Sequence, residues 1–124
     1  MARKSQAWKD FERAFAKLLV FFGLDAYRKT RGQDWGKSDF DVEIKDHPNF
    51  KFDCKYSIKR WKTSSMLETV REKYCNDPPR VTPEGLDGDI PILLCKNYRE
   101  PGSKATLDTD VLVFLLAYYL KDKK

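Results

Sequence analysis

Asp53 and Lys55, near the middle of the sequence, carry opposite charges two positions apart. In a β-strand this spacing places both side chains on one face, roughly 6 to 7 Å apart. An aspartate can bind a divalent cation, and a lysine ammonium beside it can orient a water molecule and stabilise negative charge on a phosphate. The pattern therefore predicts phosphodiester hydrolysis, although a surface ion pair on a strand has the same pattern.

Further carboxylates are predicted to reach this strand. Apolar and charged residues alternate over 39–44 and again over 50–57, which predicts two antiparallel strands with one charged face. That face gathers Asp41, Glu43, Asp53 and Lys55. Glu12 projects about 20° beyond the apolar stripe of a predicted first helix. Glu12, Asp41 and Asp53 could together supply the oxygen ligands that magnesium prefers, although a boundary glutamate more commonly pairs with a lysine or arginine.

The elements that position these residues begin with an amphipathic helix from about Gln6 to Phe22, ended by Gly23. Its core stripe is predicted to contain Trp8, Phe11, Phe15, Leu18, Leu19 and Phe22. A short extended piece over 25–28 and a basic, glycine-containing loop over 29–38 follow. The two charged strands come next, joined by a turn at His47. The first half of the chain therefore predicts one helix followed by strands.

The second half begins with a predicted helix from about Ser65 to Tyr74, with a capping box formed by Ser65 and Glu68. Its buried stripe is Leu67, Val70 and Tyr74. Residues 76–89 are predicted to be a long loop, and the apolar run 90–95 a strand buried on both faces. After a second loop over 97–109, residues 110–114 are predicted to form a last strand that passes into a short terminal helix. The order of elements predicts an α/β fold.

Composition limits the function further. The 124 residues suit a single domain spanning 1–124, and a net charge of +5 with a pI near 9.1 suits a polyanionic partner. Three cysteines without C-x-x-C spacing predict neither a disulfide framework nor a zinc cluster, and point to a reducing cytoplasm. The single histidine, His47, excludes multi-histidine metal sites. Catalysis would therefore depend on carboxylates and lysine.

With these residues in place, the sequence resembles the PD-(D/E)XK nuclease superfamily. The pattern is a helical glutamate, Asp41, eleven further residues, and then Asp53-x-Lys55. Other segments are similar to Holliday-junction resolvases of the archaeal type, and the small size favours a virus- or phage-encoded relative. These segments are Lys4–Ala7, Glu12–Leu19, Gly36–Ser38, Phe40–Val42, Asp53–Lys55 and Ile90–Leu93.

The resemblance implies a restriction-endonuclease-like fold with an αβββαβ core, in which a central mixed β-sheet is flanked by helices. It implies that Glu12, Asp41, Asp53 and the Cys54 carbonyl hold magnesium, for which manganese could substitute. Lys55 would position the water, and Ser38 would contact the scissile phosphate. A homodimer would then nick a four-way DNA junction symmetrically in the cytoplasm, or in the host cytoplasm if the protein is viral. The expected DNA-binding residues are Arg3, Lys4, Arg28, Lys29, Arg31, Lys37, Lys59 and Arg60.

The sequence leaves several alternatives open. Asp53 stands where these resolvases usually have glutamate, and Asp39 or Glu43 could take a ligand role. The substrate could be a flap, nick or mismatch, and a non-catalytic DNA-binding module or a structural viral protein would carry similar charges. The aromatic chain end could form dimer contacts or belong to the core; its residues are Phe114, Tyr118 and Tyr119.

Overall fold

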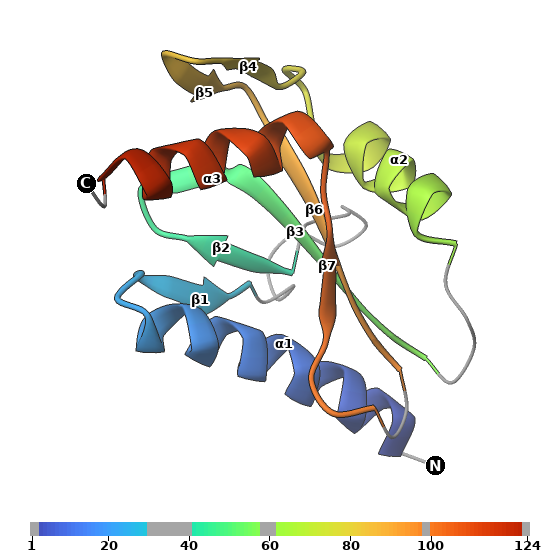
Figure 1. Ribbon diagram of the computed structural model, residues 1–124. Coiled ribbons are helices and arrows are strands. Elements are labelled where there is room, and N and C mark those ends of the chain that lie inside the picture. Colours follow the sequence, from blue (N-terminus) through green and yellow to red (C-terminus); the bar gives the residue numbers. More distant parts are fainter. Residues whose placement is uncertain (1–2, 30–40, 58–61, 98–99, 123–124) are drawn as a thin grey trace.

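The computed structural model describes residues 3–29, 41–57, 62–97 and 100–122 (Figure 1). In chain order the elements are α1 (Arg3–Phe21), β1 (Ala26–Arg28), β2 (Val42–Ile44), β3 (His47–Ser57), α2 (Thr63–Tyr74), β4 (Arg80–Thr82), β5 (Gly85–Asp87), β6 (Ile90–Asn97), β7 (Lys104–Thr106) and α3 (Thr109–Asp122). Five strands form one sheet in the order β1-β2-β3-β6-β7, while β4 and β5 form a separate hairpin. Because β3 and β6 are parallel and the other neighbours antiparallel, the sheet is mixed. The predicted α/β class, with a mixed sheet flanked by helices, is confirmed.

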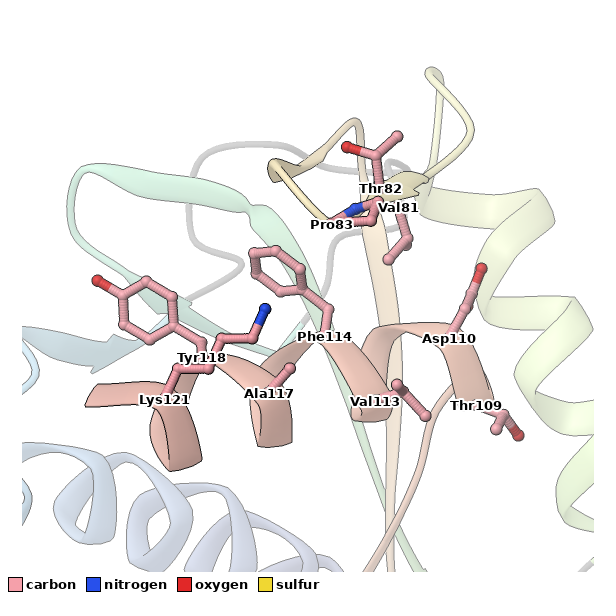
Figure 2. Close-up of a pocket in the computed structure, with 10 residues that line it drawn as sticks. All are labelled: Val81, Thr82, Pro83, Thr109, Asp110, Val113, Phe114, Ala117, Tyr118 and Lys121. Atoms are coloured by element: carbon pink, nitrogen blue, oxygen red, sulfur yellow. The ribbon is translucent and has the colours of Figure 1, made fainter. Parts of the chain in front are cut away.

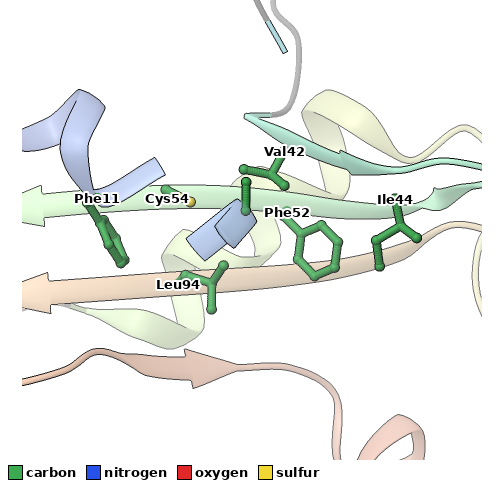
Figure 3. Close-up of a cluster of buried hydrophobic side chains, with 7 residues drawn as sticks. Phe11, Val42, Ile44, Phe52, Cys54 and Leu94 are labelled. Atoms are coloured by element: carbon green, nitrogen blue, oxygen red, sulfur yellow. The ribbon is translucent and has the colours of Figure 1, made fainter. Parts of the chain in front are cut away.

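Helix α1 covers one face of this sheet. Phe11 and Ala16 of the helix pack against alternate residues of β2, β3 and β6, as the period-two geometry of strands requires. Figure 3 shows Phe11 beside the strand residues. The strand residues of this cluster are Val42, Ile44, Phe52, Cys54 and Leu94. Phe15 adds an edge-to-face contact with Phe52 at a ring-centroid distance of 5.0 Å. The cluster fixes α1 across the strands that carry the predicted site.

Helix α2 packs through Leu67 and Val70 against Leu93 and Cys95, the β6 residues that point away from α1. The prediction that β6 is buried on both faces is therefore confirmed, as is the buried stripe of α2, with Tyr74 partly buried. The predicted capping box is wrong, because the helix begins two residues earlier and its N-cap residue, Lys62, makes no side-chain cap. Ser65 instead donates its hydroxyl to the Lys62 carbonyl.

The C-terminus of α1 ends as predicted at a glycine. Gly23 has φ +93°, and the amides of Gly23 and Leu24 donate to the carbonyls of Val20 and Leu19, which is the hydrogen-bond pattern of a Schellman motif. The predicted core stripe is wrong at this end, where Leu18 and Phe22 are 53% and 73% exposed. The three-residue strand β1 lies beside the last turns of α1 and is too short to cover them (Figure 1).

Two predicted loops contain strands. Residues 80–87 form the hairpin β4–β5, in which Arg80 pairs with Asp87, so the prediction of a structureless loop over 76–89 is wrong. Gly88 closes this segment with φ +84°, and a Cβ there would lie 2.3 Å from the Pro78 carbonyl oxygen. The loop predicted over 97–109 contains β7, which completes one edge of the sheet. Short polar strands of this kind lack the apolar alternation that identifies a strand.

The last element differs most from its prediction. Residues 110–114 are not a strand but the first part of the fourteen-residue helix α3. The β-branched and aromatic residues in this run suggested a strand, but its apolar character continues to Leu120, which is long enough for a helix. Within the described ranges, none of the helices combines the length and apolar content that a membrane crossing requires.

Candidate metal and nucleic-acid site

Asp41 lies immediately before β2, where its side chain takes part in the pairing with β3. Its backbone amide donates to the Phe52 carbonyl at 3.0 Å, as in the regular hydrogen bonding between two antiparallel strands. Its carboxylate oxygen Oδ2 then accepts the next amide of β3, that of Cys54, at 2.7 Å. The Asp41 carbonyl accepts the Lys29 amide at 2.9 Å, which ties the same residue to the β1 side. The Asp41 carboxylate is therefore held at a fixed point of the sheet.

Glu12 approaches Asp41 from α1. Its side chain is buried, at 2% exposure, although sequence geometry predicted only a boundary position. One carboxylate oxygen, Oε1, accepts a hydrogen bond from Arg28 Nε at 2.6 Å. The other, Oε2, is buried and has no hydrogen-bond partner among the described residues. A buried carboxylate oxygen without a donor is unfavourable, so this atom is suited to a positively charged ligand.

Asp53 and Lys55 lie on the same face of β3, as their spacing predicted. The Lys55 ammonium is 3.2 Å from Asp53 Oδ2, with Asp53 at 7% exposure and Lys55 reaching solvent. Because side chains alternate along the strand, Asp53 points to the face opposite Phe52 and Cys54. Asp53 also lies close enough to Asp41 to raise its pKa. Asp41 is therefore the acid with which both Glu12 and Asp53 interact.

This crowding of acids shifts the titration of Asp41. Burial raises the pKa of Asp41 from 3.8 to about 8, against the lowering effect of the Cys54 amide and with a further increase from Glu12 and Asp53. Burial and the same three carboxylates also raise the pKa of the Cys54 thiol. The acids and Lys55 thus surround Cys54 closely enough to act on one another. Burial beside two other acids therefore favours the protonated, neutral form of Asp41.

The Cys54 carbonyl, predicted to be a metal ligand, accepts a hydrogen bond from the Trp8 indole nitrogen at 3.2 Å. A carbonyl oxygen has two lone pairs, so this contact leaves one for a further partner. Trp8 was predicted only as a core residue. The signal that could have identified its second role is the general need of a buried indole N–H for an acceptor.

Arg28 was predicted to contact DNA, and its ion pair with Glu12 was missed. Glu43, an alternative ligand, is held on the β1 side, where it accepts hydrogen bonds from the Tyr27 hydroxyl and from Lys29. Burial opposes ionisation of Glu43, but these two donors lower its pKa overall. The structure therefore brings Glu12, Asp41, Asp53 and Lys55 together and directs Glu43 elsewhere.

Several predicted site residues lie outside the described part of the chain. These are Ser38, Asp39, Arg31, Lys37, Lys59 and Arg60, together with the side chains of Arg3 and Lys4. Of the predicted DNA-binding residues, Arg28 and Lys29 are described. Arg28 pairs with Glu12 and places its positive charge at the site, whereas Lys29 pairs with Glu43 on the β1 side.

The donor set can be tested for its fit to a metal. Among the described residues, no three His, Cys, Asp or Glu side chains already stand in a metal-coordinating cluster. The buried Glu12 Oε2 without a donor, and the burial that together with Glu12 and Asp53 raises the pKa of Asp41, nevertheless both favour added positive charge. Carboxylate oxygens are hard ligands and suit magnesium or manganese. The residues therefore fit a hard divalent cation held by Asp41 with Glu12 or Asp53.

Comparison of the chain with protein-family models, curated proteins and solved structures finds no match. The arrangement of the side chains around Asp41 therefore provides the main basis for a functional proposal.

Proposed function

We propose that this protein is a divalent-cation-dependent endodeoxyribonuclease that nicks four-way DNA junctions, with its active site at Asp41. The observation that carries the proposal is that Glu12 and Asp53 both act on Asp41, and that Lys55 pairs with Asp53, around one strand residue, Cys54. Buried acids beside a lysine are the groups that metal-assisted phosphodiester hydrolysis needs. The +5 net charge supports an anionic substrate such as DNA.

The residues would have distinct roles. Glu12, Asp41 and Asp53, with the second lone pair of the Cys54 carbonyl, would hold magnesium or manganese. The cation, when bound, supplies positive charge against the non-bridging oxygens of the phosphate. Lys55, which reaches solvent from β3, would orient the attacking water and stabilise charge on the phosphate. Arg28 would contact the DNA backbone near the same acids.

The proposal includes a restriction-endonuclease-like arrangement. It is supported by the order α1, β1, β2, β3, α2 and β6, which follows the αβββαβ core that the sequence resemblance implies. The hairpin β4–β5 would then be an insertion between α2 and β6, and β7 and α3 would be additions after the core. A homodimer would present two such sites to the two opposed strands of a junction.

A nicking assay tests the activity. Purified protein with magnesium should nick a synthetic four-way junction, and Asp53→Ala or Lys55→Ala should reduce the rate by about 100-fold or more. Matched controls are Asp10→Ala and Lys73→Ala, which remove the same groups from exposed helical positions and should leave the rate unchanged. No nicking, or equal nicking by Asp53→Ala and Asp10→Ala, would refute the proposal.

The substrate is tested in the same assay. The junction should be cleaved faster than a flap, a nicked duplex or a mismatched duplex of the same sequence. If one of the other DNA structures is cleaved faster, the proposed nuclease activity stands, and that structure replaces the four-way junction as the proposed substrate.

A second candidate is a non-catalytic DNA-binding module. The Arg28–Glu12 and Lys55–Asp53 ion pairs favour it, because they neutralise two of the acids without a metal. This candidate predicts junction binding at low salt with no cleavage under any divalent cation. It also predicts that Asp53→Ala alters stability alone, whereas the nuclease requires loss of cleavage in a folded variant.

A further inference from the structure

Helix α3 carries no charged residue from Val111 to Leu120, yet most of it is exposed. Val111 is fully buried, whereas seven apolar residues of the helix are between 41% and 71% exposed. A helix that is apolar all round is normally covered by other parts of a protein. Among the described elements, α3 makes its main contacts with the small hairpin β4–β5 (Figure 1). The helix is therefore suited to a further partner.

The space for such a partner is a groove of about 990 Å³ between α3 and the hairpin. Figure 2 shows Phe114 and Tyr118 extending from the helix on the side of Val81 and Pro83. Ala117 lies between the two aromatic residues along the helix and leaves room beside it. The groove thus has an apolar floor formed by one helix and a wall formed by the hairpin.

The residues of α3 in this groove follow the spacing of a helix-pairing seam. Asp110, Phe114, Ala117 and Lys121 all line it, at successive steps of four, three and four residues. This is the alternation of positions with which one helix contacts another in a coiled coil. The seam has an acid at its start, a base at its end, and one large and one small residue between them.

We propose that this groove binds α3 of a second copy of the chain, with the two helices antiparallel about a two-fold axis. In a two-fold interface each contact occurs twice, so the surface must be complementary to itself. Antiparallel pairing sets Asp110 opposite Lys121 of the partner subunit and Phe114 opposite Ala117 of the partner subunit. Opposite charges then meet at both ends, and a large residue meets a small one at both central positions.

A lipid surface fits α3 less well. A helix that lies on a membrane has a polar face rich in lysine and arginine, whereas the charges of α3 stand at its ends. The self-complementary order of charge and size is also a property that an unrelated partner would not require. The pairing does not depend on nuclease activity, because its evidence is confined to α3 and the hairpin.

Charge exchange tests the pairing. Sedimentation equilibrium should give twice the 14.6 kDa chain mass at high protein concentration, with dissociation on dilution. Asp110→Lys and Lys121→Asp should each weaken self-association roughly tenfold, because like charges then face each other at both ends. The double variant should recover most of the lost affinity. Both single changes oppose the helix dipole, so recovery in the double variant reports pairing and not helix stability.

Neighbouring positions provide a matched control. Ala117→Glu places a charge in the groove and should give a monomer, whereas Leu116→Glu changes a 48% exposed residue outside the groove and should leave the dimer intact. Circular dichroism establishes that each variant is folded. The proposal would be overturned by a wild-type chain that stays at 14.6 kDa, by a double variant as weak as the single ones, or by dissociation through Leu116→Glu alone. Binding of the monomer to anionic vesicles, abolished by Leu116→Glu, would replace the second copy with a lipid surface.

Discussion

Asp41→Asn should stabilise the protein in the absence of metal while removing its proposed activity. Asn keeps the shape of the side chain and an oxygen that can accept the Cys54 amide, but it has no negative charge. Wild-type Asp41 must either keep a proton or place a third negative charge beside Glu12 and Asp53. The substitution removes this conflict, which makes it a direct test of the electrostatics of the site.

The magnitude follows from the pKa of Asp41, which rises from 3.8 to about 8 on folding. A raised acid pKa means that the folded state binds a proton more tightly, so its contribution to stability is complete below pH 3.8 and is lost as the pH rises to about 8. A difference of one in pKa corresponds to about 1.4 kcal/mol, which gives about 4 kcal/mol at pH 7 and about 6 kcal/mol above pH 8. Replacing the Asp41 carboxyl group with an amide weakens the hydrogen bond from the Cys54 amide, at a cost of about 1 kcal/mol. Asp41→Asn should therefore raise the free energy of unfolding by about 3 kcal/mol at pH 7.

Urea denaturation in EDTA at pH 4, 7 and 9 measures this difference. The variant should be less stable than the wild type by up to about 1 kcal/mol at pH 4, and its relative stability should increase at each higher pH. Asp25→Asn, at an exposed position, is the matched control and should change the free energy of unfolding little at any of the three pH values. A variant that is less stable than the wild type at pH 7, or a difference that does not depend on pH, would show that folding does not raise the pKa of Asp41.

Three further predictions concern the cation, Arg28 and the core. Magnesium affinity, measured by calorimetry, should rise up to about tenfold per pH unit between pH 6 and pH 8, because the cation competes with the proton on Asp41. Binding should release protons, and an affinity independent of pH would contradict this prediction. Arg28→Met should lower the free energy of unfolding by about 3 kcal/mol in EDTA, because it leaves the Glu12 carboxylate buried without its partner. The loss should be smaller in saturating magnesium, where the cation would replace the lost positive charge. An equal loss in EDTA and in magnesium would exclude Glu12 as a ligand. Leu93→Ala, at 0% exposure between β6 and α2, should cost about 3 kcal/mol in urea denaturation, whereas Leu112→Ala on exposed α3 should cost less than about 1 kcal/mol in the monomer.

The site could be predicted from sequence to the extent that it depends on local periodicity. Strand alternation placed Asp53 and Lys55 on one face, and helical periodicity placed Glu12 near the inner side of α1. The burial of Glu12 could not be obtained in this way, because it depends on how α1 crosses the sheet. The hydrogen bond between the Asp41 carboxylate and the Cys54 amide likewise depends on where β2 begins.

The fold was predictable where apolar residues recur with a regular period and was missed where they do not. β3, β6 and α2 have such patterns, and the structure contains them. The hairpin β4–β5 is held by polar contacts such as the Arg80–Asp87 ion pair, which leave no periodic signal in the sequence. The first part of helix α3 was predicted as a strand for the opposite reason, because the helix is apolar on all sides and so has no amphipathic period to distinguish a helix from a strand.

The charges around Asp41 also explain how the same residues could form a stable site both without a cation and with one bound. Glu12 and Asp53 are balanced by Arg28 and Lys55, and the raised pKa of Asp41 favours a proton on the third acid. This set is neutral, so the fold can bury it in part without an excess of charge. If the proposed cation binds, its two positive charges exceed the one that the proton supplied, and the hold of the acids on Arg28 and Lys55 must weaken. Both basic side chains would then be free to contact a phosphate, so cation binding should increase the affinity for DNA as well as permit its cleavage.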